Sequence, residues 1–236
     1  MKKSIFFLAL LLTVCCKSNY MNKGLEKIGA FNKKAPIVKL SSETKNIVFI
    51  PMVHIAIEEF YIDVKKKIDS LSNLGYYFYC EEVITKDCDS ITLRKYKKLQ
   101  GFPFSKTGRY KQIMDSIYKL KYSEKIVDQP SYKKLGVDSI VGRNVDVSLK
   151  DMVSFYESKH GEIKLTDCDY KTSLFEKTIC KDKLVDKKIK DEVIVDFRNT
   201  NIVNTILKEK RSKIAIIYGS KHFKGIREEL LKQGFK

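Results

Sequence analysis

Residues 46–54 read Asn-Ile-Val-Phe-Ile-Pro-Met-Val-His, and residues 213–222 read Lys-Ile-Ala-Ile-Ile-Tyr-Gly-Ser-Lys-His. Each segment is an apolar run typical of a buried strand, and each ends in a histidine. Both continue into an amphipathic stretch and then a glycine with an aromatic residue, Gly75-Tyr76 and Gly234-Phe235. The chain has three histidines, and two of them occupy corresponding positions here. The pattern predicts two related strand–histidine–helix halves whose imidazoles meet where the strands end.

The stretches after both runs favour helices that cross back over a sheet. Apolar residues at helical spacing are Phe60, Val64, Ile68 and Leu71 in the first half, and Ile226 and Leu230 in the second. The first helix leads into the aromatic run Tyr76–Cys80, which favours a strand. A strand, a crossover helix and a second strand form a unit whose strands pair in parallel.

The region between the halves has a weaker pattern. We predict helices over Lys106–Lys121 and over Leu149–Tyr156 with Ser148 as N-cap, a connector over Gly142–Asp146, and a loop or hairpin over Gly161–Thr178. Ile189–Lys208 predicts a helix, although Val193–Val195 alone would also suit a strand. The expected fold is α/β, with a central, mostly parallel sheet flanked by helices and a helical middle insertion.

The N-terminus predicts export. Lys2 and Lys3 precede an apolar run of signal-peptide length that is too short to span a bilayer. Cys15 or Cys16, directly after this run, resembles the lipidated cysteine of a bacterial lipoprotein; an ordinary secretory signal is the alternative. We expect a signal over residues 1–15, a polar tether over 16–45 that runs into a first short element, and one domain over 46–236. The protein would then be anchored to a membrane on the periplasmic side or at the cell surface.

The net charge and the pattern of glycines indicate which partners and cofactors the chain is expected to lack. The formal net charge is +17, or +15 without Lys2 and Lys3 (17 − 2). The lysines are spread along the whole chain, which is typical of solvated helix faces, so we expect no nucleic-acid partner. We expect no nucleotide cofactor either, because the sequence contains no phosphate-binding glycine loop and no dinucleotide fingerprint.

Four cysteines lie beyond the signal: Cys80, Cys88, Cys168 and Cys180. An even number in an exported protein suggests disulfides. Cys168 and Cys180 share a polar segment and are the favoured pair, whereas Cys80 lies in an apolar run that would bury it. Their spacing does not match a zinc site.

Polar residues that follow the predicted strands are the candidates for chemistry, because functional groups of open α/β sheets gather beyond the carboxyl ends of the strands. His54 and His222 follow the two repeated runs, and Glu81 and Glu82 follow Tyr76–Cys80. Two imidazoles and a carboxylate suit zinc, manganese or iron, and the carboxylate could also act as a general base. A surface or helix-capping role for each histidine and a solvated acidic pair are the alternatives.

Arg198 and Asn199 lie at the start of a strongly apolar helical stretch. An arginine there could clamp a carboxylate or stabilise an oxyanion, although a surface position is the alternative. Ser220, close to His222, offers a hydroxyl nucleophile, but the nucleophile-elbow motif is not present around it.

Together these residues resemble the TraB/GumN family, which includes the Tiki-type proteases and is related to the EreA/ChaN-like fold. The matching motifs are Pro51-Met-Val-His54, Tyr79-Cys-Glu81-Glu82, Phe197-Arg198-Asn199 and Gly219-Ser-Lys-His222. The resemblance covers roughly residues 45–83 and 190–236. Glu81 matches the family glutamate by spacing, Asp146 corresponds loosely to an acidic position, and Pro51 departs from the family's glycine.

The resemblance implies metal-dependent hydrolysis of peptide bonds. His54, His222 and Glu81, with Glu82 as the alternative carboxylate, would hold a divalent ion (zinc, manganese, cobalt or iron) and its water. Arg198 would stabilise the oxyanion, supported by Asn199. The alternatives are a non-catalytic binding lipoprotein with the same fold, and a metal-free hydrolase that uses Ser220 or His222.

Overall fold

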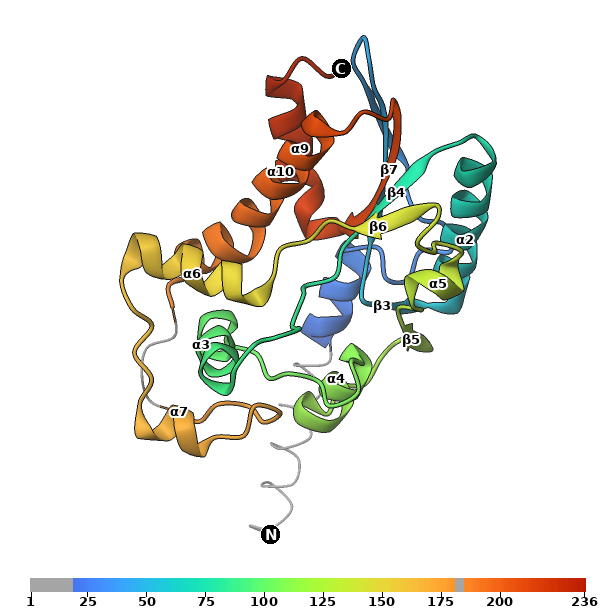
Figure 1. Ribbon diagram of the computed structural model, residues 1–236. Helices are drawn as coiled ribbons and strands as arrows, with labels where there is room; N and C mark the ends of the chain where they lie inside the picture. Colours follow the sequence, from blue (N-terminus) through green and yellow to red (C-terminus); the bar gives the residue numbers. More distant parts are fainter. Residues whose placement is uncertain (1–18, 181–184) are drawn as a thin grey trace.

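The computed structural model describes residues 19–180 and 185–236, and its centre is a five-stranded sheet (Figure 1). The strands, in spatial order, are β1 (Val38–Ser41), β2 (Asn46–Met52), β7 (Lys213–Gly219), β4 (Tyr77–Cys80) and β6 (Gly142–Asn144). β1 runs antiparallel to β2, and the other neighbours are parallel. The predicted α/β fold with a mostly parallel sheet is confirmed.

The two repeated segments are neighbouring strands, with β2 and β7 in register from Asn46 opposite Lys213 to Met52 opposite Gly219. Pro51 therefore lies opposite Tyr218, and the two copies are offset by one residue. The Asn46 N–H donates to the Ser212 carbonyl and so points toward β7. Successive backbone N–H groups of a strand point to opposite sides, so the backbone nitrogen of residue 51 faces β1. β1 stops pairing at Phe49. Pro51, which has no N–H, consequently leaves no ladder bond unmade.

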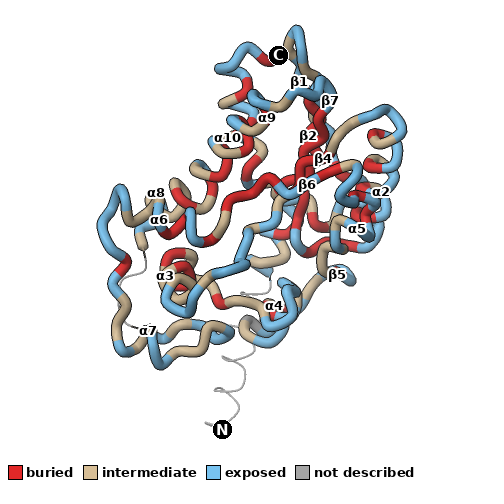
Figure 2. The backbone as a smooth tube through the Cα atoms, viewed as in Figure 1, coloured by how far each residue is buried: buried red, intermediate tan, exposed pale blue. Residues whose placement is uncertain are grey.

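Helices cover both faces of the sheet, and the strands between them are buried (Figure 2). Helix α2 (Glu58–Asn73) packs Phe60, Val64 and Ile68 against Val48, Ile50 and Ile217. On the other face, α9 (Phe197–Lys208) and α10 (Ser220–Lys232) pack Ile202, Ile206, Ile226 and Leu230 against Phe49, Ile214 and Ile216. Alternating side chains of β2 and β7 thus enter opposite layers, and apolar burial on both faces stabilises the pair.

Most of the middle insertion lies below the sheet in the view of Figure 1, apart from β6, which is an edge strand of the sheet. Its helices are α3 (Ser90–Gln100), α4 (Tyr110–Tyr118), α5 (Tyr132–Leu135), α6 (Leu149–His160) and α7 (Asp167–Lys171). A two-stranded sheet joins β3 (Ile55–Ile57) to β5 (Ile126–Asp128). A third apolar cluster, which includes Leu99, Leu149 and Met152, lies between α3 and α6.

Several local predictions need correction. The helix expected over Lys106–Lys121 is shorter, because Lys119 takes a left-handed conformation (φ 49°) that ends α4. The connector at Gly142 forms the edge strand β6, and the loop expected over Gly161–Thr178 contains α7. Val193–Val195 is helical, in a π-helical turn η1 (Glu192–Asp196) between α8 (Lys187–Asp191) and α9, so the strand alternative is wrong. Ser148 caps α6 as predicted.

The segment expected to be a tether packs onto the domain. Residues 19–27 are helical, and Leu25, Ala30 and Ala35 are buried. The signal over residues 1–15 and the lipidation candidates Cys15 and Cys16 lie outside the described residues. Within the described part of the chain, no helix is both long and apolar enough to cross a membrane.

Cys168 and Cys180 form the disulfide that the sequence favoured, while Cys80 is buried and Cys88 half-buried, both as free thiols. The disulfide closes the α7 loop against α3. Arg94 of α3 donates to the Asp169 and Thr172 carbonyls at 2.6 and 2.8 Å. These contacts connect the α7 loop to α3, which lines one side of the cavity that also contains Glu81 and His222.

Candidate functional site

Glu81, the first residue after β4, is held by both its backbone and its side chain. The Tyr132 hydroxyl donates to the Glu81 carbonyl at 2.9 Å and accepts from its N–H at 3.2 Å. One carboxylate oxygen, Oε1, accepts from Arg198 Nη2 at 2.6 Å, and the other, Oε2, accepts from the Gly219 N–H. Two contacts therefore hold the Glu81 backbone and two hold its carboxylate, at the carboxyl edge of the sheet.

His222 approaches the same point from the first turn of α10. Its Nδ1 lies 2.8 Å from Oδ1 of the buried Asn199. With that oxygen as acceptor, Nδ1 carries the proton of the neutral ring and Nε2 keeps its lone pair. Nε2 faces Glu81 Oε1 at 3.5 Å. Asn199 therefore fixes the ring orientation and the tautomer.

The Glu81–His222 pair suits a divalent metal. Two ligands bonded at about 2.1 Å to one tetrahedral ion lie about 3.4 Å apart, close to the observed 3.5 Å. A carboxylate oxygen and an imidazole lone pair at this separation are both electron-pair donors, so a cation or a water proton between them is favourable. The hydrogen bond from Nδ1 to Asn199 is the kind of outer contact that orients metal-binding histidines.

His54 does not complete this set of ligands. Among residues 19–180 and 185–236, no group of three His, Cys, Asp or Glu side chains is arranged to hold a metal ion. The His54 ring is stacked on Tyr110 of α4, with centroids 4.2 Å apart and planes 4° from parallel. His54 follows β2 and precedes β3, whereas His222 lies inside a helix. The two histidines reach one site from different local structures.

Arg198 clamps two carboxylates, which is one of the two roles expected from the sequence. Its Nε and Nη2 form a fork with Asp146, at 2.8 and 2.5 Å, and Nη2 also reaches Glu81. Nη1 donates to the Ile194 carbonyl at 3.3 Å. Four of the five N–H groups are thereby used, so this geometry favours positioning of Glu81 over donation to an oxyanion.

Two glycines permit these close contacts. A β-carbon on Gly219 would lie 2.9 Å from Glu81 Oε2 and 3.6 Å from the His222 ring. On Gly225, in α10, it would overlap the Asn199 amide. Glycine at the end of β7 is therefore required for the backbone contact with Glu81, and glycine in α10 for the approach of Asn199.

Burial and charge set the protonation states. Burial raises the pKa of Glu81, but the Arg198 charge, together with the two histidines, brings it below its ordinary value. Burial and then Arg198 lower the pKa of His222 to about 4. Burial also lowers the pKa of His54, partly opposed by Glu81. At neutral pH the site therefore combines an ionised carboxylate with neutral imidazoles, the forms that bind metals.

These groups open into a cavity of about 1100 Å³. Its wall includes His54, Glu81, Arg198 and His222, with Tyr96 from α3 and Tyr110 from α4. Lys27 and Ile28, from the N-terminal segment, line it as well. A cavity of this size, lined by apolar and aromatic side chains together with polar and charged ones, is large enough for a ligand site.

The remaining candidates lie near the site in other roles. Glu82 is exposed, and the Asn144 side chain bonds its backbone. The Glu81 side chain is 10% exposed, so Glu81 is the more buried of the two carboxylates. Ser220 lines the cavity wall. Sequence reasoning missed Tyr110 and Tyr132, and it noted Asp146 merely as a loose match. Asp146 follows a short strand at the same sheet edge, a position that could have marked it.

No protein-family model matches the chain, and neither a curated protein nor a solved structure matches it significantly.

Proposed function

We propose that this protein is a hydrolase that cleaves peptide bonds at the Glu81–His222 site. One observation carries the proposal: an ionised, rigidly held carboxylate faces the free nitrogen of a neutral imidazole at 3.5 Å, at one end of a large cavity. Water that bridges Glu81 Oε1 and His222 Nε2 would be oriented for attack on a carbonyl carbon entering from the cavity.

The proton movements follow from these positions. Glu81 Oε1 accepts a proton as the water oxygen bonds to the carbonyl carbon, and the carboxylic acid then returns that proton to the leaving amine nitrogen. Arg198 keeps the carboxylate ionised before attack and fixes its orientation, while Asp146 holds Arg198. Asn199 keeps the proton of His222 on Nδ1.

Glu81 and His222 would hold a divalent ion such as zinc, manganese, cobalt or iron, whereas His54, the third ligand expected from the sequence, is not arranged with them. When bound, such an ion supplies Lewis-acid polarisation and a water of lowered pKa. Tyr96 of α3 and Tyr110 of α4 line the same cavity as the reacting groups.

The test combines metal analysis with hydrolysis of a mixed peptide library by the purified chain. We expect a stoichiometric divalent metal, and a fall in rate of roughly 10²-fold or more in Glu81→Gln. His222→Ala should lose both metal and activity. Glu82→Gln, which changes the exposed neighbouring carboxylate, is the matched control and should keep both. Equal rates in Glu81→Gln and Glu82→Gln would contradict the proposal, and activity that survives a chelator would remove the metal from it.

A non-catalytic binding protein is the second candidate. Both oxygens of Glu81 already accept hydrogen bonds from Arg198 and Gly219, an arrangement that would serve a rigid binding site equally well. Peptides that bind in the cavity, lose affinity in Tyr110→Ala and are released uncut would favour this function over hydrolysis.

We also propose that the domain is exported and anchored to a membrane through Cys15 or Cys16. The Cys168–Cys180 disulfide supports an oxidising compartment. Incorporation of a labelled fatty acid into the wild-type chain, and its loss in either Cys15→Ser or Cys16→Ser, tests the anchor and identifies the modified cysteine.

A further inference from the structure

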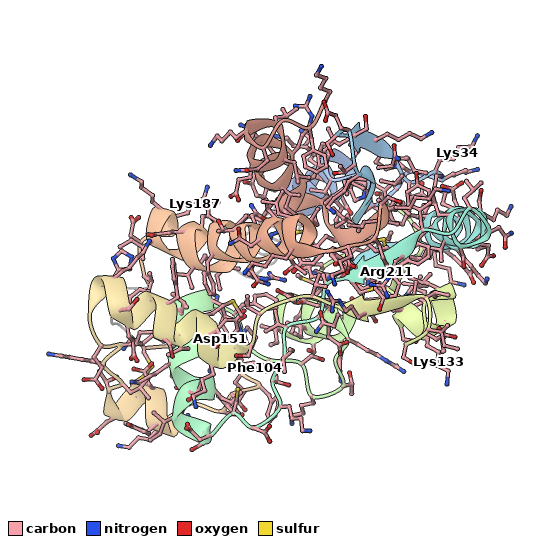
Figure 3. The ribbon with its side chains drawn as sticks, turned by 45° about the horizontal axis from the view of Figure 1, so that its top comes forward. Lys34, Phe104, Lys133, Asp151, Lys187 and Arg211 are labelled. Atoms are coloured by element: carbon pink, nitrogen blue, oxygen red, sulfur yellow. A yellow bond between two sulfur atoms is a disulfide. The ribbon has the colours of Figure 1, made fainter. Side chains whose placement is uncertain are left out.

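A second hollow lies at the amino end of the parallel strands, at the opposite pole of the sheet from Glu81 and His222. Its volume is about 740 Å³. Its lining residues are Arg143, Thr205, Lys208, Glu209, Lys210 and Arg211. Figure 3 labels Arg211, which lies beside β4 and β6. Arg211 lies two residues before β7, and Gly219 ends that strand. The length of β7 therefore separates the hollow from the candidate site by about 20 Å.

Aromatic rings hold the two arginines in place. The Arg143 guanidinium lies 5.3 Å from the ring centre of Tyr79, and that of Arg211 lies 4.0 Å from the ring centre of Tyr77. The two tyrosine rings contact each other edge to face. Such contacts restrict where each cation can move. The sheet therefore presents two preorganised guanidinium groups at the edge of the hollow.

A buried carboxylate organises the same groups. Glu209, whose side chain is 7% exposed, accepts from the Tyr79 hydroxyl at 2.7 Å and from Arg211 Nη1 at 3.0 Å. Its Oε2 also lies 3.5 Å from Arg143 Nη2. Glu209 thus fixes both arginines but offsets the charge of one.

The lining keeps an excess of positive charge. Four cations and one carboxylate give a net charge of +3 (4 − 1). Lys208 and Lys210 have no side-chain acceptor among the described residues, so their ammonium groups are available to a ligand. Arg143 and Arg211 likewise keep N–H groups beyond those that contact Glu209 and Tyr79.

We propose that this hollow binds a ligand that carries phosphate groups. A guanidinium fork matches two phosphate oxygens, and ammonium groups add charge without fixed geometry. A multiply charged phosphate would neutralise the excess charge, while the tyrosines and Glu209 preserve the positions of the arginines. The phosphate could come from a soluble compound or from a lipid headgroup, because the four cations would contact either in the same way.

Calorimetric titration of the full chain with inorganic pyrophosphate, at low and at physiological ionic strength, tests the site. We expect one binding event that weakens with salt, and a loss of affinity of at least about tenfold in Arg211→Gln. Lys208→Gln with Lys210→Gln provides a second variant that removes no internal contact, and it should also weaken binding. Lys224→Gln on α10, a lysine that is 87% exposed and does not line the hollow, is the charge-matched control.

Vesicles distinguish the two phosphate sources. Binding to phosphatidylglycerol vesicles that Arg211→Gln abolishes, with pyrophosphate as competitor, would assign a headgroup; pyrophosphate binding without vesicle binding would assign a soluble ligand. Either result supports the site. The proposal is overturned if neither probe binds, or if Lys224→Gln weakens binding as much as Arg211→Gln, since general surface charge would then explain the affinity.

Discussion

Glu81 Oε1 and His222 Nε2 lie 3.5 Å apart at the ends of two adjacent parallel strands, β4 and β7. Neither residue could hold this position alone. Arg198 and the Gly219 N–H fix the carboxylate, and Asn199 fixes the imidazole. The geometry of the Glu81–His222 pair thus depends on neighbouring residues that need not contact a substrate.

Replacing Arg198 should destabilise the fold. In Arg198→Met the carboxylates of Glu81 and Asp146 stay buried without their common partner, and breaking a buried ion pair in this way costs about 3–5 kcal/mol. Arg198→Lys keeps a charge but not the fork, so its loss should be smaller. The free energy of unfolding in urea measures both.

The double variant Arg198→Met/Asp146→Asn checks the cause. Removal of one of the two unpaired charges should restore part of the lost stability. A double variant less stable than Arg198→Met would show that the loss comes from packing rather than from the unpaired carboxylates.

Gly219→Ala should disable the site at little cost to the fold. The new methyl would lie 2.9 Å from Glu81 Oε2, so the carboxylate must move away from the Gly219 N–H and from His222. We expect hydrolysis and metal content to fall together, while the far-ultraviolet circular dichroism is unchanged. Gly24→Ala is the control, because a β-carbon there meets no atom within 4 Å. Full metal content in Gly219→Ala would show that Glu81 is not a ligand.

Tyr110 should control the environment of His54. Tyr110→Ala removes the stacked ring, a contact worth about 0.5–1.5 kcal/mol, while Tyr110→Phe preserves it. In proton NMR the imidazole signals of His54 should lose their ring-current shift in Tyr110→Ala and keep it in Tyr110→Phe. Peptide hydrolysis should follow the same order, with a fall of up to about tenfold in the alanine variant. Identical His54 signals in the two variants would contradict the stack.

The sheet was predictable where strands are long and apolar. Residues 47–53 and 214–218 could hardly be anything other than buried strands, and alternation assigned their side chains to two layers. β6 gave no such signal, because Arg143 and Asn144 are exposed. Its place depends on pairing with β4 and on Gly142, where a β-carbon would lie 2.8 Å from Phe78. Such long-range contacts leave no local pattern.

The site was predictable in its residues but not in its connections. Glu81, His222, Arg198 and Asn199 were found because they follow strands or begin a helix at one edge of the sheet. The equivalence of the two histidines fails, because β3 intervenes between His54 and α2. Tyr110 comes from the insertion, 56 positions after His54 (110 − 54), and no local feature of the sequence joins them.

The stability that Glu209 gives the fold, at the end of the sheet with the second hollow, should depend on pH. Burial opposes ionisation of Glu209, but the Tyr79 hydroxyl and the Arg211 contacts lower the pKa of this carboxyl from 4.5 to about 2. A carboxyl whose pKa is lower in the folded state stabilises the fold above its ordinary pKa. That contribution is lost as the pH falls from about 5 toward 2, and it amounts to at most about 3 kcal/mol.

Glu209→Gln isolates this contribution, because all other titrating groups are common to both proteins. The wild type should exceed the variant in free energy of unfolding at pH 6, and the difference should shrink steadily as the pH approaches 2. High salt should reduce this difference in free energy of unfolding less than it would reduce the contribution of an exposed ion pair, because the Glu209 side chain is 7% exposed. If the difference in free energy of unfolding stays constant between pH 6 and pH 2, the glutamine must replace the carboxylate in its hydrogen bonds. The charge of Glu209 would then not be what holds Arg143 and Arg211 at the hollow.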